Sequence, residues 1–230
     1  MPTMLRTVLG KGLTMVAVLA MALMLIAGAT IAGEDDAVKK ERGDKKKDRE
    51  TRAWTALFNG KDLTGWKAEG KAVWKVQDGI LIGVQGPDGA AGDLFTEKDY
   101  DDFRLKVTFK MEWPANSGVW FRYQEPDKAY QADILEYKNP ECYTGTLYCP
   151  GRMFLAMNTD PAIVKRDDWN TMIIRAKGDR LQITLNDVKV ADVRDDAMLT
   201  GKIGFQIHSG DEFKNMKLMV REVLLRPLKQ

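Results

Sequence analysis

Side chains that could move protons lie on a strand near the end of the chain. The segment 203–208 contains His208, the only histidine among the 230 residues. Period-two alternation along this segment predicts one apolar face and a second face that carries Gln206 and His208. Because histidine side chains generally titrate near neutral pH, His208 is a candidate acid or base. The alternative is an ordinary surface histidine.

A second polar set lies in Tyr130–Tyr137, which contains two carboxylates. As a strand, this segment places Gln131 and Asp133 on one face and Glu136 on the other. A glycosidase that uses paired carboxylates needs both groups beside one bond, so opposite faces disfavour that mechanism. Gln131 and Asp133 form the more coherent polar face, and a solvated strand residue is the alternative for either acid.

The segment Asn116–Tyr123 combines a turn with an aromatic strand. Strict alternation predicts that Trp120 and Arg122 share a face. An aromatic ring beside an arginine is a common arrangement for holding a sugar, because the ring stacks on the C–H face and the guanidinium donates to oxygens. The alternative is that Trp120 belongs to the core.

Cys142 and Cys149 are the only two cysteines. In an oxidising compartment a disulfide closing this short loop is a candidate, and two free thiols are the alternative. Two thiols cannot complete a zinc site, and His208 is distant in the sequence. A divalent cation held by oxygen ligands remains possible, since acid-rich loops such as 99–102 occur.

These residues must be positioned by strands, because period-two patterning dominates the chain after residue 53. Phe103 to Met111 alternate with polar residues, and Leu181 to Leu185 lead through Asn186-Asp187 into Val188 and Val190, which predicts a hairpin. Shorter strands are expected at 73–76, 80–84, 118–123, 146–148, 171–176, 203–207 and 216–220. No segment of this region has a long helical period, so we predict an all-β sandwich of two antiparallel sheets, preferably a jelly roll.

The charge distribution excludes a basic nucleic-acid-binding domain. The formal net charge is +2, and the excess of cations lies before residue 53. Nothing in 53–230 concentrates positive charge for phosphates. Residues 33–52 have almost no apolar side chains and are expected to form a charged, disordered tether. Residues 53–230 are expected to form one domain.

The first 32 residues resemble an export signal. Arg6 and Lys11 precede an almost unbroken apolar run from Leu13 to Ala27, and small residues suited to signal peptidase follow. The run is short for a membrane span, which needs about 20 residues. We expect a signal peptide, or an uncleaved signal anchor as the only membrane contact. Either version places the domain in the periplasm, the cell envelope or outside the cell.

Six segments together resemble the 3-keto-disaccharide hydrolase family. The opening WTALFNGKDLTGW at 54–66 is the most specific of them. The others follow in the family's order at 116–122, 130–136, 144–148, 169–170 and 201–210. The resemblance implies a concanavalin A-like jelly roll that handles carbohydrate, and a hydrolase or lyase acting on glycosides already oxidised at C3.

The resemblance also implies a pocket lined by eight residues: Asn116, Trp120, Arg122, Gln131, Asp133, Tyr148, Gln206 and His208. In it His208 would be the acid or base, or the residue that orients it. Asp133 would be a second proton carrier or a ligand of a divalent metal. Arg122 would hold the ketone or enolate oxygen.

One departure from the family pattern concerns the carboxylates. The family commonly has Glu, Gln and Asp in the pattern YE.QI.D, where this chain has Gln131, Asp133 and Glu136. The change implies either a swapped pair that keeps the chemistry or a non-catalytic member. A carbohydrate-binding, lectin-like module of the cell envelope is therefore the alternative function, since jelly rolls serve both roles.

Overall fold

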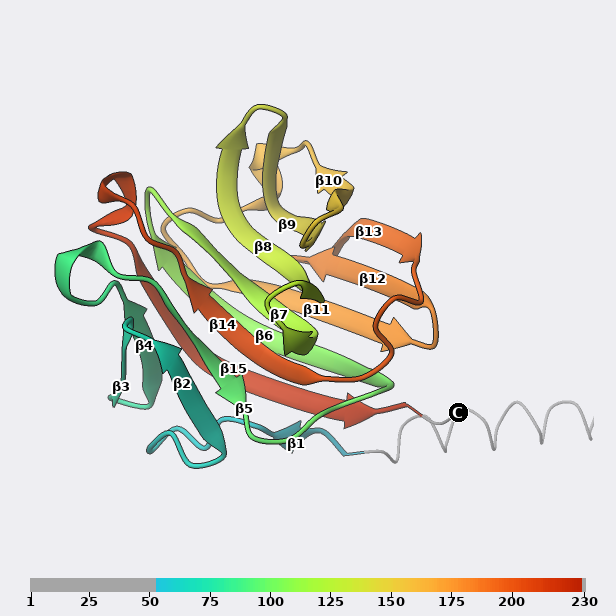
Figure 1. Ribbon diagram of the computed structural model, residues 1–230, viewed down its shortest axis with the longest axis horizontal. Coiled ribbons are helices and arrows are strands. Elements are labelled where there is room, and N and C mark those ends of the chain that lie inside the picture. Colours follow the sequence, from blue (N-terminus) through green and yellow to red (C-terminus); the bar gives the residue numbers. More distant parts are fainter. Residues whose placement is uncertain (1–52, 229–230) are drawn as a thin grey trace, which may run out of the picture. The chain divides into compact units, whose positions relative to one another are not determined.

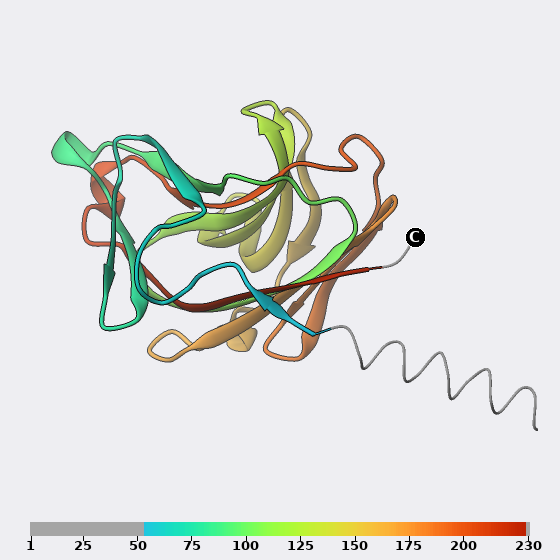
Figure 2. The ribbon, with the colours of Figure 1, turned by 90° about the horizontal axis from the view of Figure 1, so that it is seen from below.

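The computed structural model describes residues 53–228, which form two antiparallel β-sheets stacked as layers (Figures 1 and 2). The strands of the larger sheet are β1 (Thr55–Ala56), β3 (Val73–Gln77), β4 (Ile80–Val84), β6 (Phe103–Glu112), β11 (Asn170–Lys177), β12 (Arg180–Leu185), β13 (Val188–Arg194) and β15 (Lys217–Pro227). Their order is β13-β12-β11-β6-β15-β4-β3, with β1 paired to β15.

The smaller sheet carries the predicted polar segments. Its strands are β2 (Trp66–Gly70), β5 (Gly92–Thr96), β7 (Asn116–Glu125), β8 (Lys128–Lys138), β9 (Glu141–Cys149), β10 (Met153–Asn158) and β14 (Lys202–Ile207). Their order is β10-β9-β8-β7-β14-β5-β2. Short 3-10 turns lie at Pro87–Gly89, Pro161–Ile163 and Asp211–Phe213. The predicted all-β, two-sheet jelly roll is therefore confirmed.

The core lies between the two sheets and follows the alternation of the sequence. The apolar residues of β6, from Phe103 to Phe109, have no exposed surface, and Ile203, Phe205 and Ile207 of β14 are buried in the same cluster. The residues between them on β14 point to the opposite face of the smaller sheet, away from the core. That outer face is where the polar residues of the smaller sheet gather.

One turn illustrates how local sequence sets a connection. The β12–β13 hairpin turns at Asn186 and Asp187, whose φ angles are 47° and 68°. Positive φ at both central residues is the signature of the turn that matches strand twist, and Asn and Asp adopt it readily. The predicted hairpin is confirmed.

The two ends of the described region are adjacent. β1 pairs with β15 through Thr55–Leu225 and Ala56–Leu224, so both ends lie on the larger sheet (Figure 1). The predicted export signal and tether lie outside the described residues. Within residues 53–228, no helix has the length and apolarity required to cross a bilayer.

Candidate functional site

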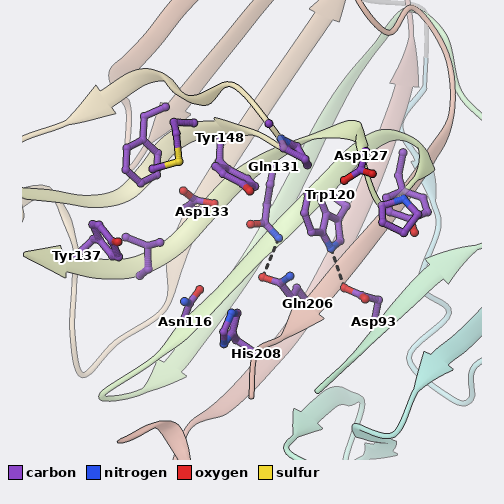
Figure 3. Close-up of a pocket in the computed structure, with 17 residues that line it drawn as sticks. Asp93, Asn116, Trp120, Asp127, Gln131, Asp133, Tyr137, Tyr148, Gln206 and His208 are labelled. Atoms are coloured by element: carbon purple, nitrogen blue, oxygen red, sulfur yellow. Dashed lines mark hydrogen bonds between the residues drawn. The ribbon is translucent and has the colours of Figure 1, made fainter. Parts of the chain in front are cut away.

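A pocket of about 530 Å³ lies on the outer face of the smaller sheet (Figure 3). Of the eight residues predicted for a pocket, the structure brings seven together as its lining: Asn116, Trp120, Gln131, Asp133, Tyr148, Gln206 and His208. They come from β7, β8, β9, β14 and the loop that follows β14. Segments separated by up to about half of the domain's length therefore meet in one place because their strands are neighbours in the sheet.

Strand register arranges these side chains in rows. Gln206 stands opposite Asp93 on one side and Gly118 on the other, and Gly118 stands opposite Asp133. The row thus crosses β5, β14, β7 and β8. Three strand spacings separate Asp93 from Asp133, or about 14 Å between Cα atoms.

The floor of the pocket is an amide pair above a glycine. Gln131 donates from Nε2 to Oε1 of Gln206 at 3.1 Å, which joins β8 to β14 across β7 (Figure 3). The side chain of Gln131 crosses directly over Gly118, where an added Cβ would lie 2.5 Å from its Cγ and Cδ atoms. The absence of a side chain at position 118 is therefore what allows the amide pair to form.

We expect Gly118→Ala to lower the free energy of unfolding by about 1 to 3 kcal/mol, the usual cost of overpacking. The cost should arise from the clash with Gln131, because Gly118 does not have a positive φ. In urea denaturation, the double variant Gly118→Ala/Gln131→Ala should therefore lose less free energy of unfolding than the sum of the losses in the two single variants. Additive effects would contradict this account.

Asp133 is the most buried polar side chain that lines the pocket. Its side chain is 2% exposed, and its Oδ2 atom has no hydrogen-bond partner among residues 53–228. Burial raises the pKa of its carboxyl well above the usual range. Desolvation disfavours the carboxylate, so this site favours the neutral acid, which can donate a proton to a bound molecule.

Asp93 lines the opposite end of the pocket and was not predicted from the sequence (Figure 3). Its Oδ1 atom accepts a hydrogen bond of 2.7 Å from Nε1 of Trp120. Burial raises the pKa of Asp93 to about 6, and Glu69 adds to the rise, whereas the bond from Trp120 and the charge of His208 oppose it. Asp93 therefore changes its charge close to neutral pH.

The raised pKa of Asp93 predicts a specific pH dependence of stability. A carboxyl with a raised folded-state pKa stabilises the fold at pH below its ordinary value of 3.8, and this contribution is lost as the pH rises through about 6. We therefore expect thermal melts to show wild type losing stability relative to Asp93→Asn between pH 4 and pH 7. A difference between the two proteins that does not change with pH would contradict the shift.

His208 stands at the open side of the pocket. Its side chain is exposed, its Nδ1 atom lies 2.6 Å from the carbonyl oxygen of Ser209, and its ring packs edge-on against Phe213. Its backbone N–H donates to the carbonyl oxygen of Asn116 at 3.3 Å, which places Asn116 beside it. With Nδ1 next to a carbonyl oxygen, the Nε2 atom is left to interact with a molecule in the pocket.

Arg122 does not line the pocket, and the expectation that it shares the face of Trp120 is wrong. Arg122 has a φ of 49°, and the register of β7 against β14 shifts between Trp120 and Tyr123. Such a bulge inserts an extra residue and reverses the alternation. Tyr123 takes the position on the pocket face, where it stacks on Phe95 with ring centroids 4.0 Å apart.

The guanidinium of Arg122 is instead a structural group with no exposed surface. It donates to the carbonyl oxygens of Asp101, Gly178 and Met198 and forms an ion pair with Asp102 at 3.2 Å. It therefore ties the 101–102 turn to two loops. The same contacts engage oxygens of the acid-rich loop that the sequence suggested for a cation.

The candidate disulfide between Cys142 and Cys149 is not present in the structure. Cys142 and Cys149 are both free and both lie on β9, seven residues apart. An extended strand rises about 3.3 Å per residue, so a segment of this length spans up to about 23 Å between Cα atoms. A disulfide joins Cα atoms at less than about 7 Å. The loop that a disulfide was expected to close is a strand.

No metal centre is assembled in the described part of the chain. Within residues 53–228, no three His, Cys, Asp or Glu side chains converge as metal ligands. Asp133, the predicted candidate ligand, lies in a site that favours its neutral form, whereas a metal-bound carboxyl must lose its proton. The surroundings of Asp133 thus suit a proton donor.

Comparison with known proteins supplies the family. Residues 53–219 match the model of the 3-keto-alpha-glucoside-1,2-lyase-like domain. A 3-keto-disaccharide hydrolase from Bacteroides thetaiotaomicron is 30% identical over 81 residues, which cover 31% of this chain and 28% of that protein. The chain therefore spans less than a third of the length of this relative.

Solved structures share the fold at lower identity. A candidate glycosyl hydrolase from Parabacteroides distasonis ATCC 8503 superposes with a TM-score of 0.60 at 21% identity, over 76% of this chain and 100% of that one. A protein of unknown function with a galectin-like fold from Bacillus subtilis gives a TM-score of 0.61 at 17% identity, over 76% and 98% of the two chains. These similarities concern the fold alone.

Proposed function

The chain belongs to the family of 3-keto-alpha-glucoside-1,2-lyase-like domains, and from that membership we propose that it cleaves glycosides whose sugar carries a ketone at C3. The observation that carries the proposal is the buried Asp133 carboxyl, which faces a pocket lined by amides and by an accessible imidazole. A neutral acid opposite a base is what an elimination next to a ketone requires.

The chemistry follows from the acidity that the ketone gives to its neighbour. A base removes the proton at C2, and the electron pair of that bond moves to form an enolate with the C3 oxygen. The enolate then collapses, the C1–O bond breaks, a C1=C2 double bond forms, and an acid protonates the departing oxygen. Addition of water across the double bond completes a hydrolysis. No carboxyl pair at ordinary glycosidase spacing is needed.

The pocket supplies one group for each role. His208 is the proposed base, because its exposed imidazole lines the pocket. The amides of Asn116, Gln131 and Gln206 surround the place where the ketone oxygen would be held. Arg122 does not hold the ketone oxygen, since its guanidinium donates to the carbonyl oxygens of Gly178 and Met198. Asp133 is the proposed acid for the departing oxygen.

The test uses the purified full chain and a 3-keto-disaccharide such as 3-keto-trehalose, with products followed by NMR. We expect cleavage of the keto form only, with the unoxidised disaccharide unchanged. Parallel reactions with added divalent metal and with EDTA report metal dependence. His208→Ala should lose turnover while it still binds the sugar.

The result that would overturn the proposal is binding without turnover. No cleavage of several 3-keto substrates, together with measurable affinity for a glycan, would assign the pocket to a carbohydrate-binding module. In that case His208→Ala should change affinity alone. An active protein whose turnover is indifferent to both His208→Ala and Asp133→Asn would refute the assigned site.

We also propose that the domain works outside the cytoplasm. The support is the sequence of the first 32 residues, with Arg6 and Lys11 ahead of an apolar run and small residues. Expression of the full chain in a bacterial host, fractionation and intact mass determination test this. Loss of about 29 to 32 residues indicates a cleaved signal, retention in the membrane indicates an anchor, and an uncleaved cytoplasmic protein contradicts export.

A further inference from the structure

The pocket has two chemically different halves. The half nearest β14 and β5 combines the titratable groups Asp93 and His208 and the amide of Gln206 with the rings of Trp120 and Tyr123. The other half is formed by the end of β8, the β9–β10 connection and the start of β10, and its lining is largely apolar: Leu135, Tyr137, Pro150, Met153 and Phe154. Figure 3 shows Tyr137 and Asp93 at opposite ends of the pocket, with the amide pair between them.

The apolar half is accessible rather than packed away. Tyr137 is 41% exposed and Met153 is 54% exposed, and both are among the large hydrophobic residues with the greatest exposure in residues 53–228. Tyr137 and Tyr148 each contact the ring of Phe154 edge-on, with centroids 5.8 and 6.1 Å apart. These rings pack against one another. We call the four residues Leu135, Tyr137, Met153 and Phe154 the apolar shelf.

The shelf lies next to the proposed acid. Asp133, Leu135 and Tyr137 alternate along β8, so their side chains follow one another on the same strand face. A leaving group whose oxygen is protonated by Asp133 and that extends along β8 toward Leu135 would contact the shelf.

The shelf offers little to a second sugar. Among its four side chains, only the hydroxyl of Tyr137 can form a hydrogen bond. A sugar can stack only its C–H face on these rings, and its hydroxyls gain few partners from the shelf. A flat aromatic group needs no such partners, stacks on exposed rings and contacts the adaptable thioether of a methionine.

We propose that this shelf is a leaving-group subsite for aromatic aglycones, so that the substrates are aryl 3-keto-glycosides in preference to 3-keto-disaccharides. The cleavage step in this inference rests on the proposed function. The preference for an aromatic leaving group rests on the shelf alone. Aromatic contact at the shelf should lower KM for an aryl glycoside, whereas a disaccharide gains no comparable contact.

The experiment compares phenyl 3-keto-glucoside with 3-keto-trehalose on the full chain. Met153→Ser and Tyr137→Ser should each lower kcat/KM for the phenyl substrate about 10-fold or more, a range typical for the loss of an apolar contact. The value for the disaccharide should stay within about twofold. Because each variant is compared on both substrates, the intrinsic difference in leaving-group reactivity cancels.

Met157→Ser is the matched control. Met157 is also on β10 and is 45% exposed, but it does not line the pocket, so this variant should leave both values unchanged. Equal losses for the two substrates would mean that the shelf holds a sugar. Unchanged values in both shelf variants would mean that the leaving group lies elsewhere.

Binding separates this inference from the proposed reaction. If no 3-keto substrate is cleaved, calorimetry with unoxidised phenyl glucoside and with trehalose still tests the shelf. Tighter binding of the phenyl glucoside that is lost in Met153→Ser but kept in Met157→Ser would support the subsite without the reaction. Equal affinity for the two glycosides would overturn it.

Discussion

We expect Asp133→Asn to slow cleavage of a 3-keto-disaccharide by about 100- to 10,000-fold, the contribution that a positioned general acid usually makes. Asparagine has nearly the same shape, but it has no proton to give to the departing oxygen. The loss should appear in kcat. It should be much smaller for a 4-nitrophenyl 3-keto-glucoside, whose leaving group departs without protonation.

The same variant reports on burial independently of catalysis. Burial raises the pKa of Asp133 in the folded state, so its contribution to stability is fully present below the ordinary value of 3.8 and is lost as the pH rises above it. In thermal melts, wild type should therefore lose stability relative to Asp133→Asn as the pH rises. The exposed turn variant Asp187→Asn, on the β12–β13 hairpin of the other sheet, is the control and should match wild type in both assays. Equal slowing of the sugar and nitrophenyl substrates would argue against the acid role.

We expect Arg122→Met to lower the free energy of unfolding by about 3 to 5 kcal/mol, as for removal of one partner of a buried ion pair. Methionine fills similar space, but the carbonyl oxygens of Asp101, Gly178 and Met198 lose their donor, and Asp102 loses its cation. Buried acceptors without partners are costly. Urea denaturation measures the effect.

The control for Arg122 is Arg180→Met. Arg180 is exposed and forms an ion pair with Asp192 at 2.9 Å, and such a pair contributes little to stability because solvent screens it. If Arg122→Met were as mild as Arg180→Met and lowered turnover specifically, the pocket role first assigned to Arg122 would be restored. Our expectation is a loss of stability instead.

Strict alternation predicted most of the site because strand faces repeat every second residue. Gln206 with His208 and Gln131 with Asp133 could be paired from the sequence, and their strands proved to lie in one sheet with only β7 between them. The prediction failed at Arg122, where a bulge changes the alternation. A bulge depends on the residues packed around it, in this case on the carbonyl oxygens that hold the guanidinium, and these are distant in the sequence.

Asp93 could not be found for a different reason. The segment before it is rich in glycine and proline, which are typical of loops, and β5 is only five residues long. Its alternation with Leu94 and Phe95 is visible only once β5 is known to pair with β14. Likewise, nothing local indicated that Cys142 and Cys149 would be held apart by a continuous strand instead of meeting around a turn.

The pairing of β1 with β15 makes the domain a natural candidate for circular permutation. The ends of the described region lie side by side and can be joined by a few residues, and new ends can be opened in an exposed loop of the larger sheet. The pocket lies on the outer face of the other sheet. The pocket could thus be carried inside a host protein, or displayed in tandem copies, without any linker crossing its opening.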